Sequence, residues 1–295
     1  MRSANTTEPN LPIGSGLVPT STFTLLIAIL MAAASVFGLF WSHRAYSSQE
    51  LYRTFVPNDA VNLCVGLPML VVPLLLARRG SLIGLLCLPG ALLFVLYSYL
   101  VYLFAVPLNA GFPLYLALVG LSTYTLVSLL AHTDSSAVRE LLKGAVHERA
   151  AGGILTVLGV LFLVRALVVL VRGVIQHMPV AKTELAVGTS DLLITPAWII
   201  CGVLLFRKRT FGYVAGLGPL YQASGLFIGL IVFLFLQPIL MGTPFRPTDV
   251  AIILVAGSIC FVPLTLFVRG ARKATRNAAN DTARPGPSGI GQGSL

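Results

Sequence analysis

The sequence predicts an all-α protein, a bundle of about eight transmembrane helices, and three observations support this fold class. First, 56% of the 295 residues are hydrophobic and 10% are charged, whereas soluble domains have about 25% charged residues. Second, nearly all of the chain lies in apolar runs of about 16 to 26 residues, and a membrane-spanning helix needs about 20. Third, Lys and Arg concentrate in alternate connections between these runs. The composition leaves no room for a separate soluble domain.

The apolar runs divide the chain into three parts. Residues 1–20 form a polar N-terminal tail, residues 21–268 a transmembrane domain, and residues 269–295 a basic C-terminal tail. We expect both tails to be disordered, because neither has the apolar periodicity of a packed helix. The eight predicted spans cover residues 21–41, 57–77, 81–106, 112–131, 152–171, 191–206, 212–236 and 250–268. Seven or nine spans remain an open alternative, because prolines blur the ends of several runs.

The first span resembles a signal peptide in one respect, since three alanines, residues 32–34, follow a short apolar core. The apolar run continues beyond them to Phe40, which is long enough to cross the membrane. We therefore interpret it as an uncleaved span.

Three connections between spans are long enough for a prediction of their structure. We expect residues 42–56 and 172–190 to be polar loops. The third, from Ser135 to Ala150, has apolar residues at helical spacing and charged residues between them. This pattern is typical of an amphipathic helix lying on the membrane surface.

The distribution of basic residues predicts the orientation. With eight spans, fourteen of the twenty Lys and Arg residues fall in the two tails and in the connections on the same side as the tails. Cytoplasmic segments carry such an excess of Lys and Arg. The net charge of +10 therefore reflects orientation in a lipid bilayer and does not indicate nucleic-acid binding. We expect a prokaryotic plasma-membrane protein with both termini in the cytoplasm.

One basic residue, Arg165, lies inside an apolar run instead of in a connection. A charge near mid-membrane costs at least about 2.5–3.5 kcal/mol, so it usually faces a partner or a watery cavity. The candidate partner is Asp191, which opens the next run. The sequence predicts that the two form a direct or one-water pair in the outer half of the bundle.

Further polar residues fall in the same outer half, and they suggest a site for a small polar or anionic ligand. Asp59 and Asn62 share one helix face because they are three residues apart. Tyr97, Tyr99 and Tyr102 lie near the outer end of the third span, where an interfacial aromatic belt is the simpler interpretation. The predicted ligand-binding residues are Arg165, Asp191, Asp59, Asn62, Asn109, Tyr99 and Tyr102. The alternative is a structural Arg165–Asp191 pair that only joins two helices.

The sequence shows no motif for a cofactor, a metal or a known catalytic mechanism. Each of the four cysteines lies in a different apolar run, and the four histidines lie at run ends or in connections. These positions favour neither a metal site nor a buried haem. Walker, HExxH and GxSxG motifs are absent. A transporter or ligand-binding membrane protein is the best prediction, and a membrane enzyme for lipid-linked or quinone-type substrates or a structural subunit remains an alternative.

The two halves of the chain share a layout, with an acid at the start of one span (Asp59, Asp191) followed by a basic turn (residues 78–79, 207–209). This layout is compatible with two parallel four-helix repeats, or with chance likeness between apolar runs and positive turns.

Two stretches, residues 58–122 and 190–213, resemble a family of prokaryotic integral membrane proteins without an assigned activity. The resemblance rests on the two acids, the turn ARRGS, the tyrosine-rich third span and Asn109. It implies the layout of the spans and assigns no functional residue.

Overall fold

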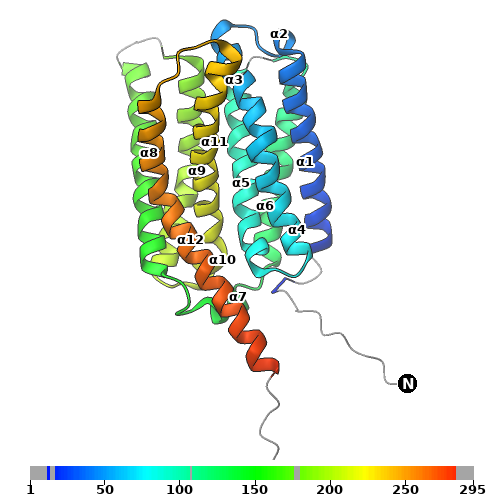
Figure 1. The fold of residues 1–295 in the computed structure, drawn as a ribbon, viewed down its shortest axis with the longest axis vertical. Coiled ribbons are helices and arrows are strands. Elements are labelled where there is room, and N and C mark those ends of the chain that lie inside the picture. The colour runs from blue at the N-terminus through cyan, green and yellow to red at the C-terminus, as the bar shows by residue number, and fades with distance from the viewer. Residues whose placement is uncertain (1–11, 14–16, 107, 176–179, 284–295) are drawn as a thin grey trace, which may run out of the picture.

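Eight long apolar helices pack side by side in one bundle (Figure 1). The computed structural model describes residues 12–13, 17–106, 108–175 and 180–283. The membrane-length helices are α1 (Leu17–Phe40), α3 to α4 (Gln49–Arg78), α5 (Leu82–Ala105), α6 (Phe112–His132), α8 (Glu148–Ile175), α9 (Lys182–Phe206), α10 to α11 (Thr210–Met241) and α12 (Pro247–Ala283). The predicted all-α fold is confirmed, and the chain is a multi-pass membrane protein.

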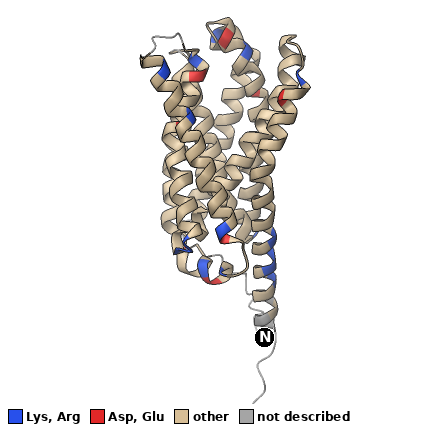
Figure 2. Cartoon of the chain, turned by 90° about the vertical axis from the view of Figure 1, so that its left-hand side faces the viewer, with Lys and Arg blue, Asp and Glu red and all other residues tan. Residues whose placement is uncertain are grey.

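The short helices mark the two ends of the bundle. We call the end with α2 (Ser42–Ala45) the α2 end and the end with α7 (Ser135–Leu142) the α7 end. The described starts of α1 and the last turns of α12 both lie at the α7 end (Figure 1). Charged residues gather at the two ends (Figure 2). Twelve of the described Lys and Arg residues lie at the α7 end and five at the α2 end, which is the asymmetry that the sequence predicted.

The second span begins earlier than predicted, because the expected loop at residues 42–56 is mostly helical. It contains α2 and the first turns of α3 (Gln49–Val61). Ser48 caps α3 by accepting a hydrogen bond from the Leu51 amide at 3.3 Å. A five-residue π-helix, η1 (Asn62–Gly66), then joins α3 to α4 (Leu67–Arg78), just before Pro68, whose nitrogen has no hydrogen to donate.

Other boundaries also differ from the prediction, mostly because helices continue beyond the predicted apolar runs. α1 includes residues 17–20, α8 extends to Ile175, and α9 begins at Lys182, so much of the expected loop at residues 172–190 is helical. The predicted surface helix at residues 135–150 is shorter, since α7 ends at Leu142 and Gly144 turns the chain with a φ of 79°.

The basic C-terminal segment is another correction, because α12 continues through Ala283 instead of ending near residue 268. Ala, Arg and Lys are strong helix formers, and the first proline after this segment is Pro285. The expected disorder is therefore wrong for residues 269–283. Residues 284–295, like residues 1–11, lie outside the described part of the chain.

α5 lies at the centre of the bundle and is buried on nearly all of its faces. It packs against α4, α6, α9 and α11. The spans on either side of α5 form two groups of buried apolar residues, and α5 contributes to both. Side chains from different faces of α5 can therefore reach both halves of the chain.

Two prolines in the second span create hydrogen-bonding contacts with α11 (Leu217–Met241). Pro57 cannot donate to the carbonyl of Arg53, four residues earlier, and Gln237 of α11 donates to that carbonyl at 3.3 Å. Pro73 likewise leaves the Met69 carbonyl without a helical donor, and the Tyr221 hydroxyl of α11 donates to it at 3.1 Å. Both bonds hold the second span to α11. The Tyr221 bond lies within the span, where the bilayer core has no water that could satisfy the carbonyl instead.

Glycines bring α5 and α11 into direct backbone contact near the α7 end. A Cβ atom added to Gly90 would fall on the backbone of Gly218, with the carbonyl oxygen of Gly218 as the nearest atom. Small residues permit this close approach of two spans. From this contact α5 and α11 continue toward the α2 end, where the candidate site lies between them.

We predict that Gly90→Ala destabilises the protein, because the methyl group would overlap immovable backbone atoms. The free energy of unfolding should fall by about 1–3 kcal/mol, the usual cost of overpacking. The measurement is a denaturant titration of the reconstituted protein. Gly120→Ala is the matched control, since a Cβ atom there meets nothing within 4 Å. Equal stability of the two variants would contradict the assigned contact.

Candidate functional site

Arg165 and Asp191 form a direct ion pair between α8 and α9. The Arg165 Nη1 atom lies 2.9 Å from Asp191 Oδ2. Asp191 is buried, with a relative exposure of 4%, whereas the Arg165 side chain is 49% exposed. The predicted pair is therefore confirmed, and it consists of a buried carboxylate with an accessible guanidinium.

The pair is deeper than the sequence suggested, because both helices extend further toward the α2 end. Arg165 is ten residues from the end of α8 and Asp191 nine residues from the start of α9. At 1.5 Å per residue these separations are about 15 Å and 14 Å. The prediction that Asp191 begins its helix is therefore wrong, because the residue lies well within α9. Both residues remain in the half of the bundle nearer the α2 end.

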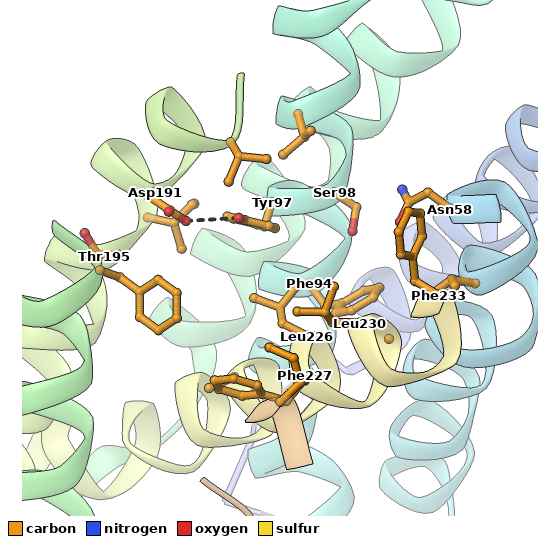
Figure 3. A pocket seen from close by; sticks show the side chains of 18 of the residues that line it. Asn58, Phe94, Tyr97, Ser98, Asp191, Thr195, Leu226, Phe227, Leu230 and Phe233 are labelled. Atoms are coloured by element: carbon orange, nitrogen blue, oxygen red, sulfur yellow. Dashed lines mark hydrogen bonds between the residues drawn. The ribbon is translucent and has the colours of Figure 1, made fainter. Parts of the chain in front are cut away.

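Tyr97 of α5 completes the coordination of Asp191. Its hydroxyl donates to Asp191 Oδ1 at 3.0 Å, the contact drawn as a dashed line in Figure 3. Each carboxylate oxygen thus accepts one hydrogen bond, from Tyr97 and from Arg165. The interpretation of Tyr97 as part of an aromatic belt is wrong, because the residue faces the bundle interior.

A cavity of about 520 Å³ lies beside this group, lined by residues of α3, α5, α8, α9, α11 and α12. This volume is within the roughly 300–1,000 Å³ of small-molecule sites. Most of its wall is apolar, and the labelled rings and branched side chains of α5 and α11 form one side of it (Figure 3). The apolar lining includes Phe94, Phe162, Trp198, Leu226, Phe227 and Phe233.

Several polar groups on the cavity wall have no acceptor or donor within the described chain. Within the described chain, the Arg165 guanidinium donates a hydrogen bond to Asp191 and to no other residue, although a guanidinium has five N–H groups. The hydroxyl of Thr195 is buried without a partner, although Thr195 lines the cavity. The Ser98 hydroxyl is a further polar group of the cavity wall. A wall of this kind suits a ligand whose polar head meets the Arg165 side of the cavity.

A second polar cluster surrounds Asp59 on another face of α5. Its carboxylate accepts hydrogen bonds from the hydroxyls of Tyr46 and of Tyr102, the latter at 2.8 Å. Asn62 donates to the Tyr102 hydroxyl at 3.3 Å. Asp59 and Tyr102 are almost completely buried. No Lys, Arg or His of the described chain lies within ion-pair distance of Asp59, so hydroxyl groups alone stabilise its carboxylate.

Asn58 connects this cluster to the cavity. Its side chain donates to the Tyr102 hydroxyl at 3.2 Å and also lines the cavity. A chain of hydrogen bonds therefore runs from the cavity wall through Tyr102 to Asp59. The two acids that the sequence paired by position, Asp59 and Asp191, are both bound by tyrosines of α5 but do not share one pocket.

The predicted ligand residues thus separate into three groups. Arg165 and Asp191 line the cavity, whereas Asp59, Asn62, Tyr99 and Tyr102 belong to the cluster beside it. Tyr99 is fully buried and donates to the Met31 carbonyl at 3.2 Å, so the aromatic-belt interpretation is wrong for it as well.

Asn109 has a local role outside the cavity. Its side-chain nitrogen donates to the Ala45 carbonyl at 2.6 Å, and its side-chain oxygen accepts from the Gly111 amide at 2.8 Å. Asn109 therefore ties the connection before α6 to α2 and does not reach the described cavity lining.

Sequence reasoning missed Asn58, Ser98 and Thr195 as cavity residues. Small polar residues occur in many spans, and no periodic pattern marks the three as members of one wall. Asn58 alone had a signal, because it directly precedes Asp59 in the sequence.

The opposite end of the bundle also contains a buried acid, which the sequence did not suggest. Glu148, the first residue of α8, accepts hydrogen bonds from the Tyr213 hydroxyl at 2.9 Å and the Gly144 amide at 3.1 Å. Lys208 lies 3.6 Å from it. These contacts join α8 to the connections at the α7 end, so Glu148 has a structural role far from the cavity.

Comparisons with protein-family models, with curated proteins and with solved structures give no match. Among the described residues, no group of His, Cys, Asp and Glu side chains could hold a metal ion.

We predict that Arg165→Leu destabilises the protein more than the double variant Arg165→Leu/Asp191→Leu. The single change leaves a buried carboxylate without its cation, at a cost of about 3–5 kcal/mol, whereas removing both charges recovers much of the loss. Denaturant titration of both variants provides the test. Arg172→Leu, at an exposed residue of the same helix, is the control. A double variant less stable than the single variant would show that the pair is not the cause.

We also predict that Tyr102→Phe lowers the free energy of unfolding by about 1–3 kcal/mol. The change removes one of two donors to the buried Asp59 carboxylate, and an unsatisfied buried acceptor costs this much. Thermal or denaturant unfolding measures the effect. Tyr124→Phe is the matched control, because Tyr124 is 60% exposed. A neutral Tyr102→Phe variant would indicate that water satisfies Asp59.

Proposed function

We propose that the protein is a small-molecule transporter or ligand-binding membrane protein, and that its cavity takes an amphipathic ligand. The observation that carries this proposal is the Arg165 guanidinium, which Asp191 holds at the cavity wall while its other N–H groups have no acceptor among the described residues. A purely structural pair would satisfy the guanidinium within the protein, because unsatisfied donors are costly inside a membrane. An intramembrane charge beside a cavity supports a ligand site.

The lining defines the class of ligand. The polar wall offers donors from Arg165, Thr195 and Ser98, so the head of the ligand must carry acceptor atoms, either anionic or neutral. The rest of the wall is aromatic and aliphatic, which favours an apolar body. A cationic head without acceptors would face the guanidinium and gain nothing from these donors.

A membrane enzyme for lipid-linked or quinone-type substrates is the second candidate from the sequence. No observation at the cavity favours it over binding: the described lining contains no histidine or cysteine. The resemblance to a prokaryotic membrane family and the parallel repeat also remain predictions.

We propose further that the α7 end faces the cytoplasm of a prokaryotic cell, so that both termini are cytoplasmic. The excess of Lys and Arg at this end supports the orientation. In this orientation the cavity lies in the outer half of the membrane.

The chain contains its own reporter for ligand binding, because Trp198 lines the cavity and the other tryptophan, Trp41, lies at the end of α1. In a Trp41→Phe background the fluorescence comes from Trp198 alone. We predict that brominated decanoate and brominated decanol quench it saturably, whereas brominated decyltrimethylammonium does not, because only the first two carry acceptors. The additional double change Arg165→Leu/Asp191→Leu should weaken the two acceptor probes at least tenfold, which is about 1.4 kcal/mol.

Arg172→Leu in the same background is the control and should leave quenching unchanged. Quenching that rises linearly with probe concentration, or that is equal for all three heads, would mean that the probes only partition into lipid. Tight binding that survives the loss of Arg165 would place the site elsewhere.

A further inference from the structure

The extension of α12 beyond the bundle carries a basic surface that the ligand cavity does not explain. Residues 247–268 of α12 are predominantly apolar, and at 1.5 Å per residue they cover about 33 Å. The hydrocarbon core is about 30 Å thick. Arg269 therefore lies where the hydrocarbon ends and the headgroup layer begins, and the next two turns of α12 pass through that layer.

Four basic residues form one stripe on this extension: Arg269, Arg272, Lys273 and Arg276. Their spacing of three, four and seven residues from the first places them on one face of a helix. All four are exposed. None forms an ion pair with a described acid. Figure 2 shows the blue bands of this stripe on the helix that projects below the bundle.

The opposite face of the same turns packs against the protein. Phe267 and Ala271 are buried, Ala274 is partly buried, and Gly270 lies against the Ala145 carbonyl. With about 100° between successive residues, the centre of the packed face lies nearly opposite the centre of the stripe. Packing on α7 and its connection therefore fixes the rotation of α12 and points the stripe away from the bundle.

We propose that this stripe binds the phosphate groups of anionic phospholipids in the leaflet at the α7 end. Three observations favour lipid over a soluble partner: the stripe starts at headgroup depth, it faces outward from the bundle, and its charges are not neutralised by described acids. Basic residues next to a transmembrane helix attract anionic headgroups, by about fivefold in affinity for each residue. The proposal does not depend on the function of the cavity.

The test is the lipid selectivity of the full-length protein reconstituted in phosphatidylcholine bilayers. Electron paramagnetic resonance measures how strongly spin-labelled phosphatidylglycerol is immobilised at the protein relative to spin-labelled phosphatidylcholine. We expect a clear preference for phosphatidylglycerol that falls as salt rises, because salt screens headgroup attraction. Changing all four stripe residues to Gln should reduce this preference at least threefold.

The matched control changes four exposed basic residues at the α2 end to Gln: Arg44, Arg53, Arg172 and Lys182. It alters the net charge equally and should keep at least half of the preference. Equal thermal unfolding of the two variants establishes that both fold. The proposal is overturned if the stripe variant keeps the full preference or if the control loses as much. Binding of a short RNA by the stripe without any phosphatidylglycerol preference would also overturn it.

Discussion

The absence of water in the bilayer core is the constraint on which the rest of this structure depends, because each polar group there must find its partner within the protein. A proline of the second span illustrates it. Pro73 leaves the Met69 carbonyl without a helical donor, and the Tyr221 hydroxyl of α11 supplies the missing hydrogen bond. A hydrogen bond lost within one helix is thus replaced by a hydrogen bond that positions a neighbouring helix.

The same constraint separates structural polar groups from candidate functional ones. The Asp59 carboxylate itself is paired, with Tyr46 and Tyr102 as donors and Asn62 on Tyr102, although the nearby Tyr115 hydroxyl is buried without a partner among the described residues. At the cavity the matching is incomplete, since most of the Arg165 guanidinium and the Thr195 hydroxyl have no partner among the described residues. α5 connects the two regions, because Tyr97 and Tyr102, five residues apart, bind the two acids.

The features that could be predicted from the sequence are those that the bilayer imposes on composition. The apolar runs predicted the eight spans, and the basic residues in alternate connections predicted which ends of the spans share one side of the membrane. The cost of a lone charge inside the membrane predicted the Arg165–Asp191 pair. Helix ends could not be predicted in the same way, because α3, α9 and α12 extend into polar residues that no hydropathy pattern assigns to a helix. For this reason the sequence predicts a disordered tail after residue 268, where the structure has further turns of α12.

The cavity itself could be predicted only in part. Its charged pair was visible as an anomaly in an apolar run, whereas Ser98 and Thr195 look like ordinary span residues until the helices are packed. Tyr97, Tyr99 and Tyr102 were ambiguous because α5 is buried on nearly every face. An aromatic residue near the end of such a helix faces neighbouring helices instead of the interface, and periodicity cannot distinguish the two environments.

The glycine contact between α5 and α11 determines where a route across the membrane would be blocked. Every residue that these two helices contribute to the cavity follows Gly90 or Gly218 in the sequence and so lies on the α2 side of the contact. Between α5 and α11 the closest approach on this side of the cavity is backbone against backbone, at Gly90 and Gly218. Beside it the buried Gln222 side chain of α11 joins Trp198 of α9 to the Leu93 carbonyl of α5. A rotamer change alone cannot separate the two backbones at the glycine contact. A ligand that crosses between α5 and α11 therefore requires these two helices to move apart and the Gln222 hydrogen bonds to break.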